Sequence, residues 1–88
     1  MNYSVRYEKE AQKNLKKIDK YQAKIIMNWI EKNLVGTDNP RIHGKGLTAN
    51  KTGFWRYRVG SYRIIAEIND GEITILILTI GHRNDVYK

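Results

Sequence analysis

Two arginines lie on either side of a short turn in the second half of the sequence. If Gly60 and Ser61 form a two-residue type II′ turn, two antiparallel strands result in which Arg58 lies directly opposite Arg63. Arg56 shares their face, because alternate residues of a strand point the same way. Like charges in opposed positions lower the stability of a hairpin, so folding alone does not explain this pair. Guanidinium groups fit phosphate oxygens and keep their charge in any surroundings, so the pattern indicates phosphate binding.

The alternative is that an acidic side chain, such as that of Glu67, neutralises these arginines. The distribution of charge favours a bound anion. The net charge is +7, and residues 39–66 contain six basic and no acidic side chains, with two tyrosines and a tryptophan among them. Such a composition is typical of nucleic-acid surfaces, although a solvated basic face has it too. We assign Arg63 to the catalytic residues, where it holds the phosphate, and RNA or phosphate binding to four further basic residues: Lys45, Lys51, Arg56 and Arg58.

A second group of candidate residues follows the last apolar segment, beginning at Gly81. Histidine is the side chain best suited to move a proton near neutral pH, which makes His82 a candidate general base. Arg83 beside it could stabilise charge that develops on a phosphoryl group, and Tyr87 supplies a phenol or a ring for stacking. The alternative is that His82 is a surface or capping residue. We interpret His43 as a surface residue.

Other classes of chemistry have little support. There is no cysteine, which excludes disulfides, thiolate zinc sites and cysteine nucleophiles. Asp85 and Glu67 are the only acidic residues expected near the arginines and form no carboxylate cluster, so no metal or cofactor is expected. The motifs GxxxxGK[ST], GxSxG and HExxH are absent. What remains is metal-free RNA cleavage, in which a base deprotonates a ribose 2′-hydroxyl, arginines hold the phosphate and an acid protonates the leaving oxygen.

Hydrophobic periodicity predicts the elements that position these side chains. Alternation from Tyr3 to Tyr7 predicts a short strand. Helical spacing starts at Glu8, and a second helix is expected between a cap at Asp19 and Gly36. So few residues separate the two helices that they should form an antiparallel hairpin.

Residues 37–53 contain the only proline and three glycines, and we expect a loop there. A loop of this length in a small domain is uncommon unless it is functional. Three strands should follow, at Phe54–Val59, Tyr62–Ile68 and Glu72–Ile80. This order predicts an α+β fold of two layers, with an N-terminal strand and a helical hairpin packed on a mainly antiparallel four-stranded sheet.

With 88 residues, the chain is expected to form a single domain over positions 1–88. The longest apolar stretch, Ile73 to Ile80, is interrupted by threonines and is too short to span a bilayer, so we expect no contact with a membrane. The N-terminus shows no apolar signal region behind a basic start. We therefore expect a cytoplasmic protein.

Two segments together resemble the RelE branch of the RelE/ParE toxin superfamily: FWRYRVGSYRII at 54–65 and IGHRNDVY at 80–87. The leading strand and helical hairpin match the layout of that family. The resemblance implies a type II toxin that enters the ribosomal A site and cleaves messenger RNA, with a 2′,3′-cyclic phosphate as product. It also implies a cognate RelB-like antitoxin, encoded alongside, that masks the active face. Operator DNA would be contacted only through the toxin–antitoxin complex.

The same resemblance implies roles for single residues. Arg63 matches a phosphate-binding arginine, Arg83 an arginine that stabilises the transition state, and Tyr87 a tyrosine that stacks on or activates the substrate. The best-known members carry lysines where this sequence has arginines on the strand before the turn, and arginine cannot readily act as a general base. This difference makes His82 our candidate for the base, with Tyr87 as the alternative.

Two other functions fit the same fold. A ParE-type toxin binds and poisons DNA gyrase without cutting RNA, and fold alone does not distinguish it from a nuclease. A catalytically inactive domain that survives as a binding module is the third possibility. The arginine set, together with His82 and Tyr87, favours the nuclease.

Overall fold

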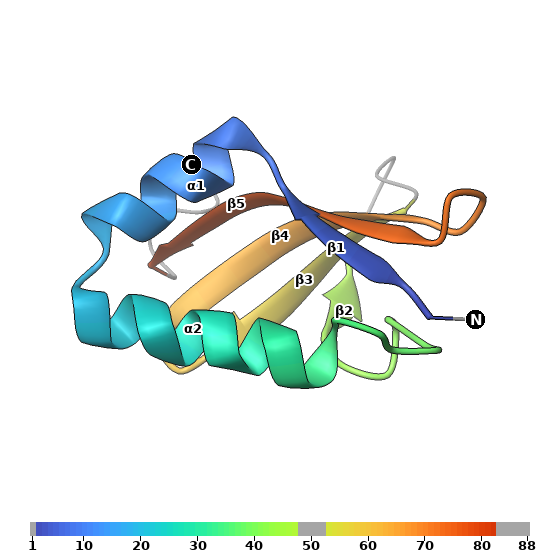
Figure 1. Ribbon diagram of the computed structural model, residues 1–88, viewed down its shortest axis with the longest axis horizontal. Coiled ribbons are helices and arrows are strands. Elements are labelled where there is room, and N and C mark those ends of the chain that lie inside the picture. The colour runs from blue at the N-terminus through green and yellow to red at the C-terminus, as the bar shows by residue number, and fades with distance from the viewer. Residues whose placement is uncertain (1, 48–52, 83–88) are drawn as a thin grey trace.

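The computed structural model describes residues 2–47 and 53–82, which form two helices and five strands. In chain order the elements are β1 (Ser4–Tyr7), α1 (Lys9–Lys17), α2 (Lys20–Asn33), β2 (Lys45–Gly46), β3 (Phe54–Val59), β4 (Tyr62–Asn69) and β5 (Thr74–His82). The strands form one curved sheet in the order β1-β5-β4-β3-β2 (Figure 1). Strand β1 runs parallel to β5, and all other neighbours are antiparallel.

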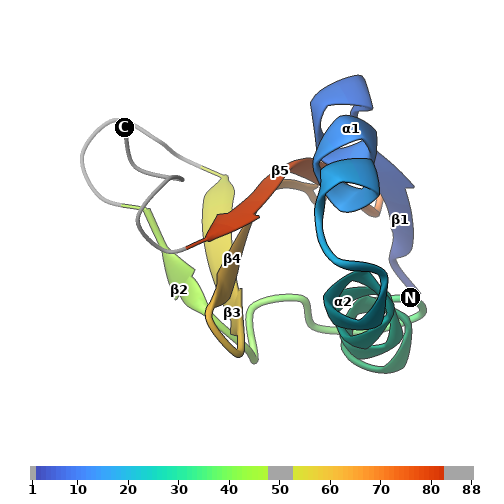
Figure 2. The ribbon, with the colours of Figure 1, turned by 90° about the vertical axis from the view of Figure 1, so that its left-hand side faces the viewer.

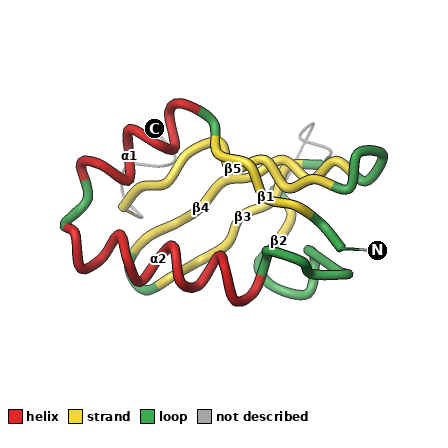
Figure 3. The backbone as a smooth tube through the Cα atoms, viewed as in Figure 1, coloured by secondary structure: helices red, strands yellow, loops and turns green. Residues whose placement is uncertain are grey.

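Both helices lie on the same side of the sheet (Figure 2). We call the other side the open face, meaning the face that neither α1 nor α2 covers. The two-layer α+β prediction is therefore confirmed. Helix α1 leads away from β1 and α2 returns, as expected for a helical hairpin, and the two helices diverge rather than pack along their length (Figure 3).

The sheet has five strands and not four, because β2 lies in the segment predicted as a loop. Only two residue pairs make this strand, Lys45 with Arg56 and Gly46 with Trp55. A strand of two residues has no alternating pattern that the sequence could reveal. Strand β5 also differs from its predicted range, since it begins at Thr74 and continues through Gly81 to His82.

The second helix begins where the sequence predicted it. The Asp19 side chain accepts hydrogen bonds from the backbone N–H groups of Tyr21 and Gln22, at 3.1 and 3.3 Å, and so satisfies two donors of the first turn. The chain leaves the helix through Gly36, whose φ of +77° favours glycine. The backbone N–H of Gly36 then donates to the carbonyl of Tyr3 at 2.8 Å, which ties the end of α2 to the start of β1.

The core lies between the helices and the covered face of the sheet. The face of the hairpin opposite the arginines packs into this core, since Tyr57, Val59 and Ile64 are buried and Tyr62 packs against them. The buried cluster consists of Ala11, Ile26, Ile30, Leu34, Tyr57, Val59, Ile64, Ala66, Ile75, Ile77 and Ile80.

Helix α1 takes over the edge of β5 where β1 ends. Strand β1 pairs with Thr74–Ile77 only. Further along β5, the Asn14 side-chain oxygen accepts hydrogen bonds from the Ile80 backbone N–H at 2.9 Å and from the Thr79 hydroxyl at 3.0 Å. One helical side chain therefore replaces a neighbouring strand at this edge.

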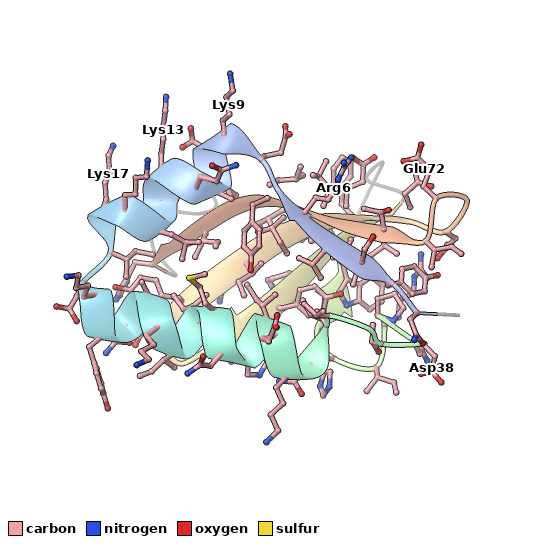
Figure 4. The ribbon with its side chains drawn as sticks, in the orientation of Figure 1. Arg6, Lys9, Lys13, Lys17, Asp38 and Glu72 are labelled. Carbon is pink, nitrogen blue, oxygen red and sulfur yellow. The ribbon has the colours of Figure 1, made fainter. Side chains whose placement is uncertain are left out.

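The outer side of α1 is strongly basic. Lys9, Lys13 and Lys17 recur every four residues, are exposed and point away from the sheet (Figure 4). Neither helix in the described part of the chain is long and apolar enough to cross a membrane.

Candidate functional site

The first hairpin places the two opposed arginines as the sequence predicted. Arg58 pairs with Arg63 and Val59 with Tyr62, around a turn at Gly60 and Ser61 in which Gly60 has φ +59°. Since Tyr62 packs against the core, Arg63 and Arg58 belong to the open face. Arg58 is exposed, whereas Arg56 and Arg63 are partly buried.

Two hollows on the molecule are lined by basic residues and glycines. The first, of about 280 Å³, is lined by Gly44, Lys45, Arg56 and Arg58. The second, of about 120 Å³, is lined by Arg58, Gly60, Ser61 and Arg63. Arg58 borders both, so its guanidinium group can serve an anion in either place. Their arginine and lysine side chains supply guanidinium and ammonium donors, which suit phosphate oxygens.

The structure brings four predicted site residues together and leaves three unplaced. Lys45 precedes the first hairpin in the chain and joins the arginines through the pairing of β2 with β3. Lys51, Arg83 and Tyr87 lie outside the described residues.

His82 lies apart from the arginines. Its cross-strand partner is Tyr62, with ring centroids 5.5 Å apart in an edge-to-face contact, whereas the partner of Arg63 is Gly81. His82 and Arg63 therefore leave opposite faces of the sheet. His82 lines a hollow of about 450 Å³ beside α1, together with Asn14 and Lys17 among others. The sequence predicted that β5 ends at Ile80. The alternation of side chains along β5 was therefore not extended to His82, where it would have placed this side chain on the covered face.

Glu67 lies at the other end of β4 from the arginine pair. It is four residues from Arg63, about 13 Å at the usual rise per strand residue. Its side chain lines a hollow shared with Arg6 and Glu72. This placement gives no support to the alternative in which Glu67 neutralises the opposed arginines.

An ion pair that the sequence analysis missed fixes the segment after α2. The Arg41 guanidinium donates two hydrogen bonds to the Asp70 carboxylate, at 3.0 and 2.9 Å, and the Tyr3 hydroxyl donates a third at 2.6 Å. The hydrogen bonds from Arg41, and to a smaller extent the one from Tyr3, hold the pKa of the Asp70 carboxyl below its ordinary value. The hydrogen bond to Asp70 in turn raises the pKa of the Tyr3 hydroxyl. No local pattern links positions so far apart in the sequence.

Two aromatic side chains of β3 bind the same segment. The Trp55 indole N–H donates to the carbonyl of His43 at 2.6 Å, and the Tyr57 hydroxyl donates to the carbonyl of Pro40, also at 2.6 Å. Burial raises the pKa of the Tyr57 hydroxyl, which therefore stays a donor. A tryptophan or tyrosine inside a strand that needs a polar partner was the signal that could have indicated these contacts.

Comparison with known proteins agrees with this architecture. Residues 5–87 match the family model described as ParE toxin of type II toxin-antitoxin system, parDE. Over its full length the chain is 30% identical to Toxin RelG of Mycobacterium tuberculosis, covering 99% of that protein.

Solved structures give the same result. The toxin–antitoxin complex RelBE2 of M. tuberculosis matches with a TM-score of 0.83 and 28% identity, over 97% of this chain and 95% of that one. The archaeal RelE–RelB complex from Pyrococcus horikoshii OT3 matches with a TM-score of 0.72 and 25% identity, over 98% and 100% of the two chains. The isolated E. coli RelE toxin, at 18% identity and a TM-score of 0.75 over 97% and 90%, shares the fold.

The fold and these matches define a toxin of a type II toxin–antitoxin system. The chain belongs to the ParE toxin family of such systems, within the RelE/ParE superfamily. The predicted membership of that superfamily is confirmed.

Proposed function

We propose that this toxin is a metal-free endoribonuclease that enters the ribosomal A site in the cytoplasm, cleaves messenger RNA and so stops translation. The observation that carries the proposal is the pairing of Arg58 with Arg63 on the face that the helices leave uncovered. The likeness to RelG and to the RelE chain of the RelBE2 complex supports it. The arginines supply the positive charge that phosphoryl transfer needs, and attack by a 2′-hydroxyl gives a 2′,3′-cyclic phosphate.

The residues divide the work as follows. Arg58 and Arg63 hold the phosphate that is cut. Arg83 stabilises the charge of the transition state. The remaining basic residues of the site bind phosphates along the RNA strand: Lys45, Lys51 and Arg56.

The general base is either His82 or Tyr87. His82 faces α1 and not the arginines, and this placement favours Tyr87. A base must be within hydrogen-bond reach of the proton that it removes, so the face from which a side chain leaves the sheet is a strong criterion.

The proposal is tested by adding the purified protein to ribosomes programmed with a defined A-site codon and mapping the ends of the message. We expect cleavage within that codon, strongly reduced in Arg58→Ala. Arg6→Ala is the matched control, because Arg6 is an exposed arginine on β1, the opposite edge strand from β2. An intact message in the presence of active ribosomes would contradict the proposal.

The second candidate function is poisoning of DNA gyrase, and the specific reason to keep it is the ParE description of the matching family model. A supercoiling assay separates the two functions. Inhibited supercoiling with an intact message supports the ParE-type function, and failure in both assays supports an inactive binding module.

The partner that we propose is a cognate RelB-like antitoxin, since the RelBE2 and P. horikoshii matches are toxin–antitoxin complexes. It would cover the arginines of the open face and so keep RNA from the site. Contact with operator DNA would come through this complex.

A further inference from the structure

The segment between α2 and β3 is fixed to the sheet over most of its described length. We call residues 37–47 the crossing segment. Arg41 is bound to Asp70, and its own pKa is raised by that carboxylate. The carbonyls of Pro40 and His43 accept hydrogen bonds from side chains of β3. Its last residues form β2. The segment is therefore held by contacts from β3 and from the turn between β4 and β5.

Gly44 shows how closely this segment approaches β3. Its φ is +77°, and a Cβ atom at this position would lie 2.1 Å from the carbonyl oxygen of Arg56 and 3.0 Å from the Trp55 indole nitrogen. At Gly46, a Cβ atom would lie 3.0 Å from the Trp55 ring. The two glycines therefore let the backbone lie directly on the strand, which no other residue would allow at Gly44.

Lys45 lies between these glycines and opposite Arg56. Its neighbours in the 280 Å³ hollow include Arg56 and Arg58, so three like charges meet around one space. Like charges in opposed strand positions repel, and two paired residues alone hold a strand weakly. The contacts of the crossing segment thus hold Lys45 beside Arg56 and Arg58, although the like charges repel one another.

We propose that the crossing segment is a clamp that positions Lys45 to bind an RNA phosphate beside the one held by Arg58 and Arg63. Gly44, Trp55 and Asp70 are then positioning residues, which act through Lys45 and do not touch the RNA. The inference rests on the proposed function, since it names how one part of that same site is assembled.

The first test compares two glycines with the same backbone strain. Gly36 also has φ +77°, but a Cβ atom there would meet nothing within 4 Å. The probe is a 2′-O-methyl RNA hexamer, which 2′-hydroxyl attack cannot cleave, titrated at several salt concentrations. We expect Gly44→Ala to weaken binding and to lower the slope of log K against log salt by about 0.7, the share of one phosphate on a single strand. Gly36→Ala should keep the wild-type slope, and equal slopes in the two variants would overturn the proposal.

The second test asks whether Gly44 acts through Lys45. Lys45→Gln should lower the slope by the same amount as Gly44→Ala, and the double variant should lose no more than Lys45→Gln alone. Two losses that add fully would mean that the close approach of Gly44 serves stability only, and the clamp would be overturned.

A third test asks whether removing one acidic charge strengthens or weakens RNA binding. It does not require that the Gly44 variants fold. Removing an acidic charge from a basic protein should strengthen RNA binding by electrostatics alone. Asp70→Asn should do the opposite and weaken hexamer binding about two- to fivefold, because it releases Arg41. Glu72→Gln, the same change in the same β4–β5 turn, is the control and should bind as wild type or more tightly. Tighter binding by Asp70→Asn would overturn the clamp.

Arg58→Ala distinguishes failure of the clamp from failure of the proposed function. If Arg58→Ala binds the hexamer as wild type does, the open face is not the RNA site and both proposals fail. If Arg58→Ala binds weakly while Gly44→Ala and Asp70→Asn bind normally, the clamp alone is overturned.

Discussion

At the scale of single residues, the opposed arginines are the place where folding and function conflict. Arg58 and Arg63 face each other across two strands, and a like-charge pair in this position costs stability. We expect Arg58→Thr to raise the melting temperature by about 1–6 °C, because threonine suits a strand and the repulsion is relieved. RNA cleavage should fall in the same variant.

The control for this prediction is Arg6→Thr, which removes an exposed arginine whose cross-strand partner is Leu76. It should give no such increase. Scanning calorimetry measures both, and an unchanged or lower melting temperature in Arg58→Thr would show that Arg58 contributes to stability through other contacts.

The second prediction concerns the proton step. His82→Gln should keep the cleavage rate and the acid limb of the single-turnover pH profile, because His82 contacts Tyr62 on the covered side of the sheet. Tyr87→Phe should lower the rate, because the proposed function favours Tyr87 as the general base. A profile whose acid limb vanishes only in His82→Gln would return the base role to His82.

Asp70 gives a pH dependence with a definite sign. Hydrogen bonds from Arg41 and then from Tyr3 lower the pKa of its carboxyl from the ordinary 3.8, so the ionised form is bound more tightly in the folded state. The resulting stability is fully present above about pH 4 and is lost as the pH falls through the lowered value. Urea denaturation of wild type and Asp70→Asn between about pH 2 and 6 measures this, and the two curves should converge on the acid side. A constant difference would contradict the assignment.

At the scale of elements, the helices and strands that could be predicted are those whose sequence carries a local pattern, such as a turn or an alternation of apolar residues. The register of β3 with β4 followed from a two-residue turn and from alternation of apolar residues, and the structure has that register. β2 could not be found, because it has only two residues and depends on the close approach of Gly44 and Gly46 to β3. The end of β5 was misplaced at Ile80 because Gly81 breaks the apolar pattern, although the backbone continues to His82. The placement of Lys45 depended on the first of these features, and that of His82 on the second.

The edge of β5 supports a prediction at this scale. Asn14→Ala removes the acceptor of the Ile80 N–H, which is partly buried, and an unsatisfied donor of this kind costs about 1–2 kcal/mol. Asn28→Ala is the matched control: Asn28 is an exposed asparagine on α2, and the gain in helix propensity is the same in both. We expect urea denaturation to show Asn14→Ala less stable than Asn28→Ala by that amount. Asn14→Asp keeps the acceptor oxygen and should restore much of the loss.

At the scale of the whole molecule, positive charge occupies both sides. The arginines lie on the open face, and the lysines of α1 line the outer side of the helical layer (Figure 4). With a net charge of +7, the protein presents positive charge to a molecule that approaches either of these two surfaces. A polyanion is attracted from either side, and in the proposed function the paired guanidinium groups of the open face select where a phosphate is held.

The last prediction follows from this distribution. An acidic antitoxin segment should associate at a rate that falls about tenfold or more between low and high salt, because long-range attraction is screened beyond about 10 Å at 0.1 M. It should come to rest over Arg58, Arg63 and Arg83, where guanidinium pairs can hold carboxylates as they hold phosphates. Stopped-flow mixing measures the rate, and hydrogen exchange locates the contact, with protection expected at the turn of Gly60 and Ser61. Protection confined to α1 and α2 would place the antitoxin on the lysine side and contradict direct masking of the site, even if activity were blocked.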